Sequence, residues 1–461
     1  MRESSASSDF AAVAFVAGAG LAAFSSQIFH DGDTWWHLAA GNWMLAHHAV
    51  PAHDIFSYTF AGAPWNAHEW LSEILMAGAF GAAGWSGLHI LFALAFGATA
   101  AIVGHALRRQ MDLIPVLITT ILGLACVAGS LLARPHILAL PLLAFWTAAL
   151  VEARQQKRAP PLWLAGLMLP WANLHGTFAF GLALAAALGL EAVIEKPDRG
   201  SALKHWGLFI GASLVAACLT PQGPSGLLFP IKLLAMPGIG VIGEWAPSDI
   251  THITPFLLAL LAMFFILAMG KVTVPAPRAV LILALTYLAL AHGRHEMLFG
   301  VAAPILAAPA MGNAWPPRGE PGRLWLVPGM ACVLALMVLV RLIWPAIRGD
   351  DRTAPVTALA HVPPALRAKP VLNAYEFGGY LIYQGVRDFI DSRADMYPAD
   401  FLERDFRLSR GDGSLLTATL AQYHIAWTIF PSGSPVAAAL DHTPGWRRLY
   451  GNANAVVHVR D

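Results

Sequence analysis

The sequence predicts an α-helical polytopic membrane protein with about eleven transmembrane helices and a small mixed α/β domain after them. Three observations support this fold class. Of the 461 residues, 57% are hydrophobic and 12% are charged, whereas soluble globular chains carry about 25% charged residues. Apolar stretches long enough to cross about 30 Å of hydrocarbon recur along the chain. After residue 347 the composition becomes mostly polar.

The first 347 residues form the predicted transmembrane domain. Its expected spans are residues 10–29, 86–107, 113–132, 137–152, 160–173, 176–194, 205–220, 253–270, 277–292, 297–312 and 323–345. The apolar segment 70–83 is too short to span, so we expect a re-entrant or interfacial helix there. Residues 10–24 also fit a cleaved signal peptide, an alternative that leaves the following loop on the same side.

The distribution of basic residues predicts the orientation. With a cytoplasmic N-terminus, the inward connections carry thirteen Lys and Arg residues, and the outward ones carry only Arg134, Lys232 and Arg294. This asymmetry follows the positive-inside rule. It places the first outer loop, about residues 30–83, and the domain 348–461 on the extracytoplasmic side of an inner or plasma membrane. The net charge of +1 gives no argument for a nucleic-acid partner.

The predicted extracytoplasmic domain contains several short segments rich in β-branched and aromatic residues, which are typical of strands. These are residues 370–373, 379–384, 387–391, 425–430 and 454–459. Residues 414–423 have the apolar spacing of a helix. The sequence therefore predicts a mixed α/β domain.

The first outer loop crowds ionisable residues next to apolar segments. Asp31, Asp33 and Glu69 accompany His37 and His68. Charged groups beside hydrocarbon are costly, so such a cluster indicates a functional site. A carboxylate there tends to have a raised pKa, which suits it to accept a proton from a hydroxyl group. Helix capping is the structural alternative for the aspartates.

Two further interpretations of this loop concern aromatic residues and metals. Trp35, Trp36 and Trp43 are expected to anchor a helix at the membrane surface and face lipid, with sugar stacking as the alternative. Asp31 and Asp33 with His37 could hold a divalent cation. Two carboxylates are a weak signal, so the metal is unknown and no cofactor is assigned with certainty.

The other outer connections supply candidate substrate-binding residues on the same predicted face. These are Arg134, His136, Asn173, His175, Arg294 and His295. Arginine binds phosphate oxygens in a fork geometry, which makes the two arginines candidates for a phosphate group. Charge balance is the alternative for the arginines, and helix-end hydrogen bonding is the alternative for the histidines. In the C-terminal domain, residues 373–380 and 391–397 fit either turns or ligand-binding strand ends.

Several motifs together resemble a known family: Asp33-Thr-Trp-Trp-His37-Leu, Pro51-x-x-Asp54-x-Phe-Ser-Tyr58, His68-Glu69-Trp70-Leu and Asn173-Leu-His-Gly176. They resemble the GT-C superfamily of integral-membrane glycosyltransferases, in its dolichyl-phosphate-mannose mannosyltransferase-like group. The resemblance implies hexosyl or pentosyl transfer from a polyprenyl-phosphate-sugar donor to an extracytoplasmic glycan, lipid or protein acceptor in the cell envelope. It also implies that Asp33 is the catalytic acidic residue and Glu69 a second one, and that Arg134 or Arg294 stabilises the departing lipid phosphate.

The chain departs from one branch of that superfamily. It lacks the acidic pair of oligosaccharyltransferases in the next outer loops and a Trp-Trp-Asp motif in the outer domain, which argues against transfer of a whole oligosaccharide to asparagine. Two other classes stay open. A transporter or flippase for lipid-linked glycans could use the same polar residues, and a non-catalytic envelope scaffold would leave Asp33 and Glu69 dispensable.

Overall fold

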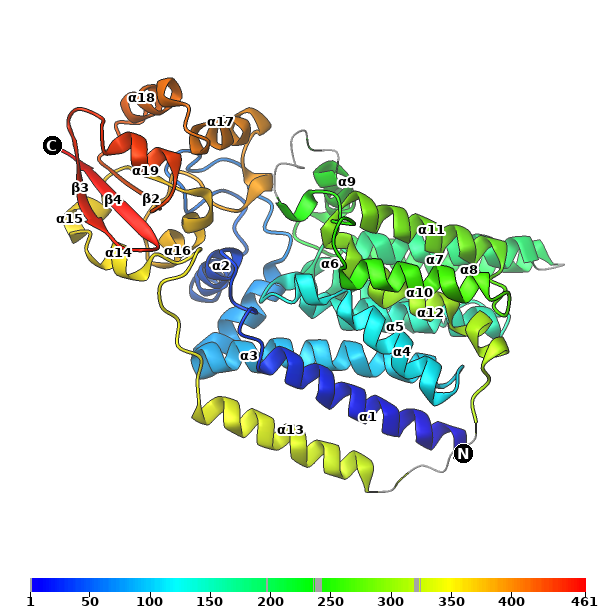
Figure 1. The fold of residues 1–461 in the computed structure, drawn as a ribbon. Helices are drawn as coiled ribbons and strands as arrows, with labels where there is room; N and C mark the ends of the chain where they lie inside the picture. Colours follow the sequence, from blue (N-terminus) through cyan, green and yellow to red (C-terminus); the bar gives the residue numbers. More distant parts are fainter. Residues whose placement is uncertain (1, 196–197, 235, 237–242, 319–322, 324) are drawn as a thin grey trace.

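The computed structural model describes residues 2–195, 198–234, 236, 243–318, 323 and 325–461. A helical bundle occupies most of the chain, and the C-terminal domain lies at one end of it, beside helix α2 (Figure 1). The helices of the bundle region are α1 Arg2–Ala23, α2 Asp33–His47, α3 Trp70–Arg108, α4 Leu113–Ala125, α5 Pro135–Gln155, α6 Met168–Leu174, α7 Phe178–Glu195, α8 Arg199–Ala217, α9 Phe229–Leu234, α10 Pro255–Ala268, α11 Ala276–Ala291, α12 Glu296–Ala314 and α13 Leu326–Ile343.

The bundle has the composition of a membrane domain. Within the described residues, seven helical segments are long and apolar enough to cross a membrane, and three shorter apolar helices accompany them. A multi-pass membrane protein is therefore confirmed. A helix occurs at each of the eleven predicted positions, but the number of crossings stays a prediction, because several of these helices are too short to span alone.

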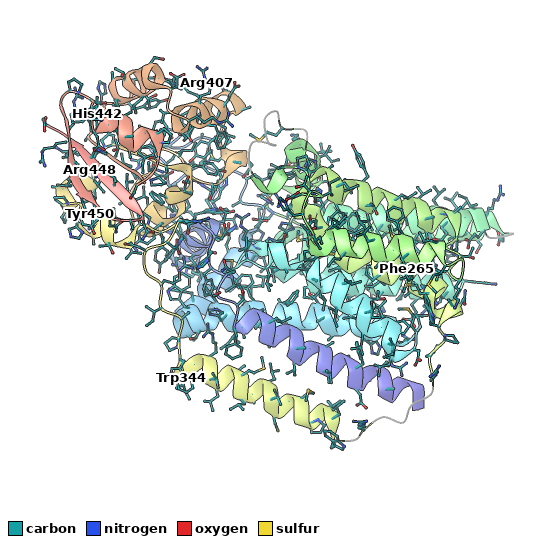
Figure 2. The ribbon with its side chains drawn as sticks, in the orientation of Figure 1. Phe265, Trp344, Arg407, His442, Arg448 and Tyr450 are labelled. Atoms are coloured by element: carbon teal, nitrogen blue, oxygen red, sulfur yellow. The ribbon has the colours of Figure 1, made fainter. Side chains whose placement is uncertain are left out.

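The outer surfaces of the two regions differ in chemistry (Figure 2). On the bundle, Phe265 is 66% exposed and Trp344 is 68% exposed. On the C-terminal domain, the exposed side chains include Arg407 and Arg448, which form surface ion pairs with neighbouring aspartates. The apolar outer surface of the bundle is suited to contact with hydrocarbon, and the charged surface of the C-terminal domain is suited to contact with water.

Helix α3 is divided by a kink. The backbone leaves helical geometry at Ala83 and at Gly84, where φ is 56°, a value that glycine adopts without steric cost. The arm formed by residues 70–83 is thus separate from the long arm that ends at Arg108, as the sequence predicts. Its re-entrant or interfacial position stays a prediction.

The C-terminal domain contains a four-stranded sheet of order β1-β2-β4-β3. Strand β1 (Val371–Asn373) is parallel to β2 (Trp427–Pro431), while β4 (Ala455–Arg460) is antiparallel to both β2 and β3 (Trp446–Gly451). Its helices are α14 Val356–Ala360, α15 Pro364–Arg367, α16 Gly378–Tyr383, α17 Ala399–Ser409, α18 Gly413–Gln422 and α19 Pro435–Leu440. The mixed α/β class and the helix at 414–423 are confirmed.

Two of the predicted strands are wrong. Residues 379–384 fall mostly in helix α16, whose side chains are buried, and a short apolar run does not separate a buried helix from a strand. Residues 387–391 are not a strand. Their backbone bonds to side chains and to the first outer loop: Phe389 N–H donates to Asn373 Oδ1 at 2.8 Å, and Asp388 C=O accepts from Tyr58 N–H at 3.1 Å.

The hydrophobic core of the C-terminal domain extends into the first outer loop. Trp35 and Trp36 are 4% and 7% exposed and belong to this core. The ring of Trp35 lies 5.0 Å from the rings of both Tyr380 and Tyr383 on α16. The expectation that these tryptophans face lipid is therefore wrong for Trp35 and Trp36, because α2 turns them toward the outer domain.

Candidate functional site

One arginine joins both aspartates that begin the first outer loop. Arg134, which directly precedes α5, donates through Nη2 to Asp31 Oδ1 at 2.6 Å and lies 2.9 Å from Asp33 Oδ2, and its Nε also contacts Asp31. Asp33 is the first residue of α2. Thr34 Oγ1 donates to Ala133 C=O at 3.2 Å. These contacts fix the start of α2 against the start of α5.

A second cluster surrounds Glu69, at the start of α3. Its carboxylate lies 3.4 Å from His175 Nε2, 3.7 Å from His68 Nε2 and 3.9 Å from His37 Nε2. On the other side of the imidazole, His37 Nδ1 lies 3.1 Å from Glu73 Oε1. His37 and His175 thus meet Glu69 although both lie far from it in the sequence.

Burial governs the protonation of this cluster. Loss of solvation raises the pKa of Glu69, against the opposing charges of neighbouring His68 and Arg294. Burial lowers the pKa of His37, and the positive charge of Arg134 lowers it further. Burial likewise lowers the pKa of His175. Near neutral pH the imidazoles of His37 and His175 are therefore uncharged, and they face the Glu69 carboxyl as neutral polar groups.

Asn173 holds the neighbouring segment in place. Its Oδ1 accepts from Trp70 Nε1 at 2.6 Å, and its Nδ2 donates to the carbonyls of Leu169 and Leu219 at 2.7 and 3.0 Å. These bonds fix the turn that presents His175 to Glu69. Substrate binding by Asn173 stays a prediction.

Two of the remaining predicted residues line a cavity of about 250 Å³. His136 and Arg294 line it, and the Arg294 guanidinium carbon lies 4.2 Å from the ring centroid of Trp245. The ring of His136 is 6.0 Å from that of His175, which connects the cavity to the Glu69 cluster. His295 packs its ring 6.1 Å from that of Trp245.

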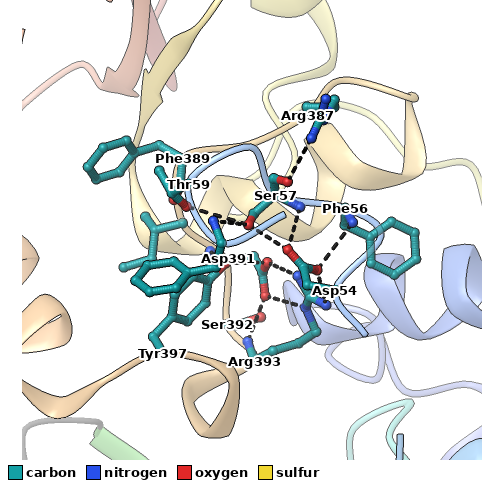
Figure 3. A network of polar contacts seen from close by, with 12 residues as sticks. Asp54, Phe56, Ser57, Thr59, Arg387, Phe389, Asp391, Ser392, Arg393 and Tyr397 are labelled. Atoms are coloured by element: carbon teal, nitrogen blue, oxygen red, sulfur yellow. Dashed lines mark hydrogen bonds and ion pairs between the residues drawn. The ribbon is translucent and has the colours of Figure 1, made fainter. Parts of the chain in front are cut away.

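A buried polar network connects the first outer loop to the C-terminal domain (Figure 3). Arg393 Nη1 lies 2.9 Å from Asp54 Oδ1, and Nη2 donates to Asp391 Oδ2 at 2.7 Å; all three side chains are 0% exposed. Tyr397 O–H donates to the same Asp391 oxygen at 2.7 Å. The guanidinium carbon also lies 4.7 Å from the ring centroid of Trp65. The loop that carries the Glu69 cluster is therefore anchored to the outer domain by buried charges.

One residue with an evident place in this arrangement was not predicted, and a second was predicted only as part of the segment 391–397. Glu73 was not singled out because it lies inside an apolar segment. Its spacing of four residues from Glu69 puts both carboxylates on one helix face, which could have revealed it. Asp395 lies in the short helix Ala394–Met396. Its charge raises the pKa of Glu69, so the outer domain contributes to the electrostatics of the cluster.

The two carboxylates predicted as possible cation ligands are bound to an arginine. Among the described residues, no group of three or more His, Cys, Asp and Glu side chains is placed to hold a metal ion. Asp31 and Asp33, the predicted cation ligands, are both bound to the Arg134 guanidinium. A cation at that point would face the positive charge of the arginine.

The fold of the chain is similar to that of solved archaeal oligosaccharyltransferases. No protein-family model matches the chain, and no curated protein matches it. Two similar solved structures are the archaeal oligosaccharyltransferase AglB from Archaeoglobus fulgidus in complex with an inhibitory peptide and a dolichol-phosphate (TM-score 0.56, 10% identity, 98% of this chain and 74% of that chain) and the apo oligosaccharyltransferase of the same organism (0.54, 10%, 91% and 69%). At this identity the likeness concerns the fold alone.

Proposed function

We propose that the protein is a membrane glycosyltransferase that moves a hexosyl or pentosyl group from a polyprenyl-phosphate-linked donor to a hydroxyl of an extracytoplasmic glycan, lipid or protein acceptor. The observation that carries the proposal is the meeting of acidic residues and arginines at one end of the bundle: Asp33 with Arg134, and Glu69 within the electrostatic reach of Arg294. A GT-C neighbour bound to a dolichol-phosphate supports a lipid-phosphate donor.

The chemistry requires a base and a stabiliser of the leaving phosphate. The base accepts the acceptor hydroxyl proton, the oxygen attacks the anomeric carbon, and the bond from that carbon to the phosphate oxygen breaks with both electrons leaving on the lipid phosphate. Glu69 suits the base better than Asp33 does. Burial raises the pKa of Glu69, whereas the Asp33 carboxylate is held in an ion pair with Arg134, which reduces its ability to take a proton.

In this mechanism Asp33 positions Arg134, and Arg294 stabilises the negative charge of the leaving phosphate. Arg294 lines the cavity beside His136, where a phosphate group would meet a guanidinium held by Trp245. Charge-assisted bonds from such a donor to a developing phosphate anion are strong in a site shielded from water.

The test is transfer of radiolabelled sugar from a panel of polyprenyl-phosphate donors by membranes that contain the wild type, Glu69→Gln, Asp33→Asn or the control Asp249→Asn. Asp249 is an exposed carboxylate whose partners are its neighbours Thr251 and His252. We expect a loss of about 10²- to 10⁴-fold for Glu69→Gln, a loss of at least about tenfold for Asp33→Asn, and no change for the control. Full activity of Glu69→Gln would remove that residue from the mechanism, and donor binding without turnover in the wild type would favour transport or scaffolding.

A further inference from the structure

A second cavity lies at the end of the bundle opposite the outer domain. Its volume is about 510 Å³, within the range of small-molecule sites. It lies among the end of α3, the end of α5 and the segment that follows α5, and Ala11 near the start of α1 contributes to it. In Figure 1 the N-terminus is at this end, far from the C-terminal domain.

The cavity has a polar part that carries net positive charge. Arg109, Arg158 and Glu152 are its charged residues, joined by His105. Arg109 pairs with Glu152 through two contacts of 3.3 Å, and these side chains are 48% and 40% exposed. An exposed ion pair of this kind contributes about 1 kcal/mol or less. Arg109 can therefore leave the Glu152 carboxylate and bind the phosphate group of a ligand, which carries more acceptor oxygens.

The rest of the cavity is apolar and reaches the outer surface of the bundle. Ala101, Ile102, Ala148 and Ala149 form part of its wall. Two aromatic side chains that line it are also exposed, Phe145 at 39% and Trp163 at 66%. Exposed tryptophan is typical of the level of the lipid headgroups. An amphiphilic ligand could thus place an apolar chain against this wall and its headgroup at Arg109 and Arg158.

We propose that this cavity binds an anionic glycerophospholipid, with the phosphate at Arg109 and Arg158 and the upper part of an acyl chain along the Ala-rich wall. Basic pockets between transmembrane helices on the cytoplasmic side hold anionic headgroups in this way. The predicted orientation puts this end of the bundle at the cytoplasmic face. A zwitterionic choline headgroup would bring an additional cation to the arginines, so it binds more weakly.

The experiment is native mass spectrometry of the purified full chain in detergent, titrated with phosphatidylglycerol, phosphatidylcholine or inorganic phosphate. We expect at least fivefold tighter binding of phosphatidylglycerol than of phosphatidylcholine. The double variant Arg109→Gln/Arg158→Gln should lose this preference, and the matched control Arg199→Gln/Arg318→Gln, at exposed arginines that do not line the cavity, should keep it.

A second variant tests the apolar slot without touching charge. Ala149→Trp fills the wall and should weaken binding of both lipids at least fivefold, while size-exclusion chromatography verifies that each variant is folded. Unchanged phosphatidylglycerol binding in the double variant, or in Ala149→Trp, would overturn the proposal. Displacement of phosphatidylglycerol by an equal concentration of inorganic phosphate would also overturn it, because the site would then recognise a free anion and not a lipid.

Discussion

Replacing Asp54 by Asn tests whether the buried network holds the first outer loop on the outer domain. Asp54 Oδ1 lies 2.9 Å from Arg393 Nη1, and its Oδ2 accepts from the N–H and O–H of Ser57 at 3.1 and 2.6 Å. An amide in this position removes the charge. Its NH₂ group then faces either the Ser57 donors or the Arg393 guanidinium, and it can accept a hydrogen bond from neither. Asp391 still pairs with the arginine, so the guanidinium does not become an unpaired buried charge.

The expected cost follows from these contacts. Loss of the Asp54 charge beside Arg393 and of one hydrogen bond from Ser57 lowers the free energy of unfolding by about 2 to 4 kcal/mol. For a folding unit of 150 to 250 residues, each kcal/mol lowers the Tm by about 2 to 4 °C, which gives about 4 to 16 °C. The assay is thermal unfolding of the purified protein in detergent, followed by tryptophan fluorescence, since Trp65 packs against Arg393.

The matched control is Asp400→Asn. Asp400 is exposed in the first turn of α17, and a substitution there changes the unfolding free energy by about 0.5 kcal/mol or less. If Asp54→Asn lowered the Tm no more than Asp400→Asn did, the buried ion pair would not stabilise the loop and the reasoning would be refuted.

Two further predictions concern packing and pH. Gly41→Ala places a Cβ 2.1 Å from the Glu73 carbonyl oxygen, whereas Gly78→Ala on the neighbouring helix meets nothing within 4 Å. We expect Gly41→Ala to lower both Tm and sugar transfer, and Gly78→Ala to keep sugar transfer and to leave the Tm equal or slightly higher, since alanine favours a helix. Burial and the charge of Glu376 raise the pKa of Asp405 to about 7. Its folded pKa exceeds its unfolded one, so this contribution to stability is complete below about pH 4 and is lost as the pH rises through about 7. Asp405→Asn should therefore gain stability relative to the wild type at pH 8 but not at pH 4, which Tm values at the two pH values would check; an equal difference at both would contradict it.

Much of the fold follows from local patterns in the sequence. Apolar stretches predict helix positions, because burial in hydrocarbon requires satisfied backbone groups within each segment. Strand β3 was missed because Arg447 and Arg448 interrupt its apolar residues, although its backbone pairs with β4. The helix α16 was missed because its residues are buried on every side, which removes the periodicity that separates helix from strand.

The candidate site was predictable in composition but not in pairing. The concentration of carboxylates and histidines in one loop identified Asp33, His37 and Glu69. Nothing in the sequence pattern indicated that Arg134 binds both Asp31 and Asp33, since these aspartates are 103 and 101 positions from it in the chain. The same holds for the contacts of Trp35 with Tyr380 and Tyr383, which belong to a domain at the far end of the chain. Long-range packing decides such contacts.

The dependence of the loop on the outer domain has a consequence for biosynthesis. Thr59 Oγ1 donates to Phe389 C=O across 330 residues, and the ion pair of Asp54 forms only after Arg393 has been synthesised. At about 5 to 20 residues per second, translation takes about 16 to 66 s to cover that distance. During this interval the segment around Asp54 and Thr59 lacks its partners in the outer domain. A polypeptide arrested before residue 393 would carry the inserted helices yet leave the segment around Asp54 without the outer domain, so quality control could distinguish it from the finished product by that exposed segment.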